Sequence, residues 1–326
     1  MKKRSNVLKI EEGSQFTFLN VFNVIFRIFK GITSAIIFLL MFFFIFSIAS
    51  LFLGGVEPLK AGNVAVIPLS GIITSVGAGG FIPDKEVISS KIVDLIKDAE
   101  KNNAIKAIIF EINSPGGSPV ATAEIAQAIQ NAKKPTVAVI REVGASGGYW
   151  VATAAKEIWA NPLSITGSIG VTGSHLEYAG LIQDYNVTYR RLVAGKYKDI
   201  GTPWREMKDE ELQLLQAVLD KLHGAFIDTV ARNRNLPREN VEELATGFVF
   251  LGEEAKQKGL VDELGTMDDA IASLEKKLNI TAELVTYKER KGFFEMLGEV
   301  SSKNFYSIGT GIGNAFITQN NPLPRV

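Results

Sequence analysis

The sequence predicts an α/β protein with a mostly parallel sheet and one N-terminal transmembrane helix. Two observations lead to this prediction. Short apolar, β-branched runs at 63–69, 105–112 and 136–140 alternate with segments of helical periodicity. Strands that are apolar along their whole length are typical of parallel sheets covered by helices on both faces. Ahead of these runs, segment 32–53 is an uncharged stretch of 22 residues.

Segment 32–53 has the length and composition of a membrane anchor. A helix rising 1.5 Å per residue over this length spans a hydrocarbon core of about 30 Å. The apolar core of a cleaved signal peptide is shorter, about 7–15 residues, so we favour a retained anchor over cleavage after Ala49 or Ser50. The preceding segment 16–29 is also apolar and is expected to form an interfacial helix that leads into the anchor.

The charges beside this segment predict its orientation. The basic residues before it are Lys2, Lys3, Arg4, Lys9, Arg27 and Lys30. Only Glu57 and Lys60 follow it closely. The positive-inside rule therefore predicts a single-pass protein of the cell membrane with a cytoplasmic N-terminus, and with the chain after Leu53 outside the cytoplasm.

The rest of the chain is expected to form one domain. A strand at 187–193 is expected in addition to the apolar runs above. Helical periodicity predicts helices at 86–100, 119–132, 146–155, 176–184, 209–232, 253–258 and 267–278. The expected organisation is a cytoplasmic segment 1–31, a transmembrane anchor 32–54, an extracytoplasmic domain 55–285 and a C-terminal tail 286–326.

Composition excludes several classes of function. The chain of 326 residues has 35 basic and 35 acidic residues, which argues against a nucleic-acid-binding protein. Cysteine is absent, so no thiolate nucleophile or cysteine metal site is possible. Histidine occurs only at positions 175 and 223, which leaves almost no material for a multi-histidine zinc site. We expect no metal and no cofactor.

Two glycine-rich loops follow buried strands and precede helices. The loop 113–118, NSPGGS, exposes backbone N–H groups that suit an oxyanion hole, a phosphate site or a plain tight turn. The loop 144–148, GASGG, presents Ser146 at a sharp turn, where it is either a nucleophile or a helix N-cap. Loops of successive βα units lie side by side at the carboxyl ends of neighbouring strands, so together they predict a site.

A serine nucleophile needs a base. The pattern G-x-S-x-G also fits α/β-hydrolases, in which an acid and a histidine follow, and Asp199 and His223 satisfy that order. However, His223 borders the apolar stripe of the predicted helix 209–232, where packing or surface exposure is the favoured role. We expect His175 to be a surface residue at a helix start.

Lysine is the remaining simple base. It must be neutral to accept a proton, so its pKa must fall from about 10.4 by about three units, roughly 4 kcal/mol. Burial lowers the pKa of a lysine in this way. Segment 194–201, AGKYKDIG, offers Lys196 and Lys198, which composition does not distinguish. If the segment is extended, both face the same way; a solvated loop is the alternative.

Five stretches together carry a resemblance to a known family. They are NSPGGS (113–118), REVGASGGYW (141–150), NPLSITGSIGV (161–171), AGKYKDIGTPWR (194–205) and GEEAKQKGLVDELG (252–265). In these stretches the chain closely resembles the signal peptide peptidase A family in its short bacterial form, whose members are Ser/Lys-dyad proteases of the Clp–crotonase fold.

The resemblance implies a repeated ββα-type fold with a mostly parallel sheet, with Ser146 as nucleophile and Lys198 as base. It implies that Ser168 orients the lysine amine and that the N–H groups of Gly116 and Gly147 form the oxyanion hole.

The resemblance also implies a membrane-anchored serine endopeptidase that degrades remnant signal peptides and other apolar peptides. It implies homo-oligomeric rings in which neighbouring protomers share each dyad. The alternatives are a crotonase-fold acyl-CoA enzyme and a non-catalytic membrane scaffold. One departure from the family is ATGFVFLG (245–252), where Phe248 and Leu251 replace polar residues.

Overall fold

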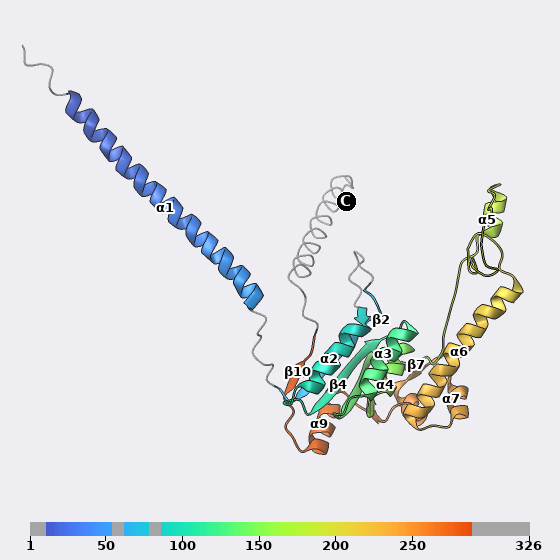
Figure 1. The fold of residues 1–326 in the computed structure, drawn as a ribbon. Helices are drawn as coiled ribbons and strands as arrows, with labels where there is room; N and C mark the ends of the chain where they lie inside the picture. The colour runs from blue at the N-terminus through green and yellow to red at the C-terminus, as the bar shows by residue number, and fades with distance from the viewer. Residues whose placement is uncertain (1–10, 54–61, 78–85, 289–326) are drawn as a thin grey trace, which may run out of the picture. The chain divides into compact units, whose positions relative to one another are not determined.

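The computed structural model describes residues 11–53, 62–77 and 86–288 (Figure 1). The chain divides into two compact units, Ala61–Arg290 on the one hand and Met1–Lys60 with Lys291–Val326 on the other. Residues 289–326, most of the predicted C-terminal tail, lie outside the described residues.

The N-terminal unit contains helix α1, Glu11–Leu53. The expected interfacial segment 16–29 lies within this same helix and is not a separate element. Its part Ile25–Ile45 has a mean hydropathy of 2.3 and is long and apolar enough to cross a membrane. None of this apolar surface is buried against the described chain, which fits a membrane anchor.

The second unit is built on an eight-stranded sheet, and the predicted mostly parallel sheet is confirmed. Along its main path every neighbouring pair is parallel. The strands in spatial order are β10 (Leu284–Thr286), β1 (Val64–Ser70), β4 (Ala107–Ser114), β5 (Thr136–Ala145), β6 (Glu157–Ala160) and β9 (Glu263–Leu264). Strand β7 (Ile165–Gly167) pairs with the end of β5, and the short β8 (Val249–Leu251) pairs antiparallel to β7.

Both faces of the sheet are covered, because alternate residues of each strand point to opposite sides. In β1, Ala65 and Ile67 enter the larger apolar cluster, whereas Val64 and Val66 enter the smaller one. The helices α2 (Ser89–Lys101), α3 (Pro119–Gln130) and α4 (Gly147–Thr153) contribute to the larger cluster, and α9 (Met267–Leu278) to the smaller. This explains why the strands are apolar along their whole length.

A small two-stranded sheet, β2 (Ile72–Thr74) and β3 (Glu86–Ile88), lies beside the loop that follows β4. The Ile73 N–H donates to the Gly116 carbonyl at 2.9 Å, and the Ser118 N–H donates to the Ile73 carbonyl at 2.8 Å. These bonds hold the NSPGGS loop on its outer side.

Residues 171–208, which we call the arm, extend from the sheet together with the first half of α6 (Asp209–Arg234) (Figure 1). The predicted strand at 187–193 is wrong: the segment has no strand, because the arm offers its β-branched residues no strand to pair with. The arm carries only the short α5 (Ala179–Asp184), which has no buried residue.

The apolar stripe of α6 is buried over half its length. Phe226, Ile227 and Val230 lie in the larger core cluster, whereas Leu212 and Val218 are exposed. The core after α6 is completed by α7 (Arg238–Leu244) and α8 (Gly252–Gln257). The C-terminal half of α6 therefore fastens the arm to the domain, while its N-terminal half presents an open apolar face.

Candidate active site

The two glycine-rich loops lie against each other at the carboxyl ends of β4 and β5, where Ser114 is in register with Gly144. A Cβ placed on Gly116 would lie 2.6 Å from the Gly147 nitrogen and 2.9 Å from the Ser146 Cβ. Only glycine permits so close an approach, and Gly116 also has a φ of 104°. The backbone of one loop thus forms a wall beside the serine of the other.

Ser146 has a strained backbone, with φ 51° and ψ −123°. Positive φ is rare in residues other than glycine and is concentrated at functional sites. The Ser146 N–H donates to the Gly167 carbonyl at 2.8 Å, so this N–H is not free to face a substrate. The next N–H belongs to Gly147, the first residue of α4, where helix N–H groups have no intrahelical partner.

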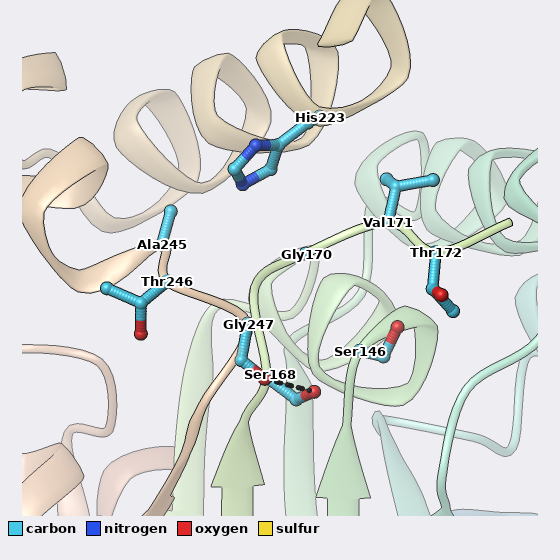
Figure 2. Close-up of a pocket in the computed structure, with 9 residues that line it drawn as sticks. All are labelled: Ser146, Ser168, Gly170, Val171, Thr172, His223, Ala245, Thr246 and Gly247. Carbon is cyan, nitrogen blue, oxygen red and sulfur yellow. Dashed lines mark hydrogen bonds between the residues drawn. The ribbon is translucent and has the colours of Figure 1, made fainter. Parts of the chain in front are cut away.

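The Ser146 side chain lines a cavity of about 270 Å³ (Figure 2). The walls come from the β5–α4 turn, the loop after β7, helix α6 and the α7–β8 connection. The lining residues are Ser146, Ser168, Gly170, Val171, Thr172, His223, Ala245, Thr246 and Gly247. A pocket that contains Ser146 and Ser168 between polar and apolar walls can admit a peptide segment.

Ser168 shares this pocket and also has a positive φ of 51°. Its N–H donates to the Phe248 carbonyl at 2.9 Å, and its hydroxyl donates to the Gly247 carbonyl at 3.1 Å (Figure 2). Because the hydroxyl proton is engaged with Gly247, the lone pairs of Ser168 Oγ are available to accept a hydrogen bond from another group.

His223, for which a packing or surface role is expected from the sequence, forms part of the pocket wall (Figure 2). Its Nε2 lies 3.3 Å from the Ile169 carbonyl, which ties α6 to the loop that carries Ser168. Asp199, the acid that a Ser–acid–His arrangement requires, instead binds Arg191 and Arg205. The chain order that fits an α/β-hydrolase therefore does not bring these groups together.

Lys198 is not among the residues that line the pocket of its own chain. It lies on the arm, where its side chain is exposed and where its amine has no bonding partner within the described residues. Lys196 differs, because its amine donates to Glu210 of α6 at 2.6 Å. This bond, with a further contact to Tyr197, holds the pKa of Lys196 well above its usual value.

The oxyanion donors expected from the sequence lie beside Ser146, but one of them is engaged. The Gly116 N–H donates to Ser114 Oγ at 3.1 Å. The nitrogen of the neighbouring Gly117 lies 3.2 Å from the position that a Cβ on Gly147 would occupy. Both glycines of the NSPGGS loop thus approach the start of α4. Among the described residues, no cluster of three or more His, Asp or Glu side chains could hold a metal ion.

Comparison with known proteins gives the family. The model for peptidase family S49 matches residues 128–281, and the Clp protease model matches residues 81–161. A putative protease of Methanocaldococcus jannaschii is 36% identical over 239 residues, covering 72% of this chain and 76% of that protein. The putative signal peptide peptidase SppA of Enterococcus faecium is 32% identical over 234 residues, covering 70% and 68%.

A chloroplast relative extends this comparison. The serine protease SPPA of Arabidopsis thaliana is 33% identical over 221 residues, covering 67% of this chain and 33% of that longer protein. The matched regions include the loop with Ser146 and the parallel strands β4, β5, β6 and β9, which agrees with a Clp protease-like α/β fold. The chain belongs to peptidase family S49 and is a serine endopeptidase.

Proposed function

We propose that the protein cleaves peptides with Ser146 as nucleophile and with Lys198 of a neighbouring copy as general base. The observation that carries the proposal is the contrast between the two lysines of the arm. Lys196 is held charged by Glu210, whereas the exposed Lys198 amine has no carboxylate bound to it in the described chain. Of the two, Lys198 alone is unbound and able to enter a second site.

The reaction that this pair supports is acyl transfer to serine. Neutral Lys198 Nζ takes the proton of Ser146 Oγ as the oxygen attacks the substrate carbonyl carbon. The charged amine then protonates the leaving nitrogen, and the C–N bond breaks to leave an acyl-enzyme. A water molecule, deprotonated by the same amine, attacks the acyl carbon and releases Ser146 with its proton restored.

Backbone N–H groups of Gly116 and Gly147 are the proposed oxyanion donors. Each such donor is worth about 10²–10³ in kcat when it is preorganised. The close approach of the two glycines supports this pairing, and release of the 3.1 Å bond to Ser114 Oγ would free the Gly116 N–H. Gly117, whose nitrogen is also near Gly147, is the alternative donor.

Ser168 is the proposed orienting group for the lysine amine. Because the Ser168 hydroxyl donates its hydrogen bond to the Gly247 carbonyl, Ser168 Oγ can accept a hydrogen bond from an N–H of neutral Lys198. An amine held in this way directs its lone pair toward Ser146, which lines the same pocket.

A base lysine must be buried to be neutral near pH 7. The arm does not bury Lys198 in its own chain, so a neighbouring copy must do so. The exposed apolar residues of the arm and α6 provide a surface for such contact: Leu181, Tyr185, Val187, Leu192, Leu212, Leu214 and Val218. We therefore propose a homo-oligomeric ring with active sites at protomer interfaces.

The proposed substrates are remnant signal peptides and other apolar peptides. Signal peptides are the substrate class that the printed name of the Enterococcus faecium relative, a putative signal peptide peptidase, gives for that protein. The proposed organisation is a cytoplasmic segment 1–31, an anchor at 32–54, an extracytoplasmic peptidase domain 55–285 and a tail 286–326. An anchored domain on the outer side of the membrane would meet such peptides where they are released.

Complementation tests the shared dyad. Ser146→Ala and Lys198→Ala should each abolish peptide cleavage by the detergent-solubilised protein. Co-expressed in equal amounts, they should restore about a quarter of wild-type activity, because in a ring about one interface in four joins an intact serine to an intact lysine. Lys196→Ala serves as the matched control and should stay active.

Two outcomes would contradict the proposal. An active Lys198→Ala variant would remove the dyad, and an inactive His223→Ala variant beside it would make the histidine of the pocket wall the base. Inactive single variants whose mixture also stays inactive would show that the dyad is not shared between copies. Labelling of Ser146 by a fluorophosphonate reports the nucleophile independently of substrate choice.

A further inference from the structure

Directly beside Lys198, four charged side chains form a continuous hydrogen-bonded chain. Arg191 donates from Nε and Nη2 to the two oxygens of Asp199, at 2.7 and 2.8 Å. Arg205 donates to the same two oxygens at 3.2 and 3.3 Å. Arg205 also forms two bonds of 2.7 Å to the two oxygens of Glu211. Bidentate pairs of this kind fix the orientation of both partners.

Three of the four side chains are largely buried in a part of the molecule that is otherwise open, whereas Arg191 is 40% exposed. The Glu211 side chain is 5% exposed, Asp199 12% and Arg205 17%. By contrast, the ion pair of Arg238 with Glu242 leaves both side chains about half exposed, at 46% and 58%. Exposed ion pairs contribute little to stability, so the buried pairs of Arg205 with Asp199 and Glu211 stabilise the loop more than an exposed pair would.

The network connects the lysine loop to a fixed element. Glu211 lies in the first turn of α6 and also accepts the N–H of Lys208 at 3.1 Å. Asp199 immediately follows Lys198 in the loop. A path of bonds therefore runs from the helix through Arg205 to the residue next to the lysine.

The network also neutralises the carboxylates near Lys198 in the sequence. Its two arginines and two carboxylates have a net formal charge of zero, and both carboxylates are occupied by arginine. The second pair on the loop and α6, Lys196 with Glu210, is likewise neutral. Neither acid of the network is bound to the Lys198 amine, although Asp199 is its neighbour in the sequence.

We infer that Asp199, Arg205 and Glu211 are positioning residues. Together with Arg191 they form a charge-neutral clamp that holds the Lys198 loop in the shape that the neighbouring copy's site receives. This inference rests on the proposed Ser/Lys dyad. The clamp has two effects: it fixes the loop on α6, and it keeps the carboxylates of Asp199 and Glu211 from pairing with the lysine amine.

Two single variants of the full-length protein in detergent test the clamp, with opposite effects on charge. Arg205→Met leaves the network with one net negative charge, which favours the protonated lysine. The acid limb of the profile of kcat/KM against pH should then move to higher pH by about half a unit. Glu211→Gln leaves one net positive charge and should move the limb to lower pH by about the same amount.

Both variants should lower kcat by about 10-fold to about 100-fold with little change in KM, because the base is misplaced rather than the substrate site. Hydrogen exchange of the segment 194–205 should speed up in both. Arg238→Met is the matched control, since it removes an arginine of α7 that also has two carboxylate partners, Asp228 on α6 and Glu242 on α7. This variant should leave all three readouts unchanged. Arg205→Lys keeps the charge and should retain the wild-type pH profile while it loses part of kcat.

The clamp is supported if the acid limbs of the two kcat/KM profiles shift in opposite directions while both variants stay folded and keep the oligomeric mass of the wild type. Limbs that do not move, or that move the same way in both variants, would overturn it, as would an Arg205→Met variant that behaves like Arg238→Met. If Arg205→Met does not fold, Glu211→Gln and Arg205→Lys still decide the question. Failure of the dyad itself is distinguishable, because Lys198→Ala would then remain active.

Discussion

Replacing Gly116 with alanine should disable catalysis and leave the domain folded. The new Cβ would lie 2.6 Å from the Gly147 nitrogen and 2.9 Å from the Ser146 Cβ. It would also force alanine into a φ of 104°. Unlike a clash with a flexible side-chain end, the contact with the Gly147 nitrogen is with backbone, so the two loops must separate for the alanine to fit.

The size of the effect follows from these distances. Ordinary van der Waals contact begins near 3.4 Å, so the methyl group is about 0.8 Å too close to the Gly147 nitrogen. A displacement of about 1 Å in a catalytic group costs about 100-fold in rate, and loss of an oxyanion donor costs about 10²–10³. The positive φ costs about 1–3 kcal/mol, which lowers Tm by about 2–12 °C in a domain of this size.

The assay is peptide cleavage at saturating substrate, measured together with thermal unfolding. Gly224→Ala on α6 is the matched control: nothing lies within 4 Å of its Cβ, and alanine should stabilise a helix interior by about 0.5–1 kcal/mol. We expect kcat of the Gly116→Ala variant to fall at least about 100-fold. A kcat within about threefold of wild type would refute the reasoning that these two loops form one rigid wall.

Three further predictions test separate features. Lys196→Ala should cleave peptides at the wild-type rate in a steady-state assay, because a carboxylate of α6 already holds this amine charged. Arg234→Met should lower the free energy of unfolding, measured in urea, by about 2 kcal/mol. The variant breaks an ion pair whose arginine is 8% exposed, but the cost is less than for a fully buried pair because water reaches the partner Asp262, which is 36% exposed. Hydrogen bonding to Arg205 lowers the pKa of Glu211 to about 2, so order in the arm should be complete above pH 4.5 and lost as pH falls toward 2. Hydrogen exchange against pH measures this loss. In Glu211→Gln, whose exchange is already faster at neutral pH, the part of the pH dependence that belongs to Glu211 should be absent.

The sheet and the two loops could be predicted because each depends on a local pattern. Uniformly apolar strands predict burial on both faces, which the division of β1 residues between two clusters confirms. Parallel pairing of β4 with β5 then brings 114 and 144 into register, so the glycine loops after the two strands must meet. Neither the buried sheet nor the meeting of the two loops depends on a contact with a residue outside these strands and loops.

Other features depend on partners that a sequence pattern does not contain. The β-branched segment 187–193 has strand propensity, but on the arm no neighbouring strand exists to pair with it. Lys196 and Lys198 are equivalent in composition, and only the position of Glu210 on α6 distinguishes them. The place of His223 in the pocket wall likewise depends on how α6 crosses the loop after β7.

The amphipathic pattern of α6 shows how a feature that the sequence predicts only in part bears on catalysis. The pattern predicts an apolar face but not what covers it. The first half of this face, which extends from the sheet together with the arm that carries Lys198, remains open. In the proposed mechanism the base is the Lys198 amine of a neighbouring copy, so a single copy would have a nucleophile without a base. Contact between copies would remove water from the apolar face and from the lysine together. In this arrangement assembly itself creates the base, and peptidase activity should be lost in proportion to the dissociated fraction when the detergent-solubilised protein is diluted.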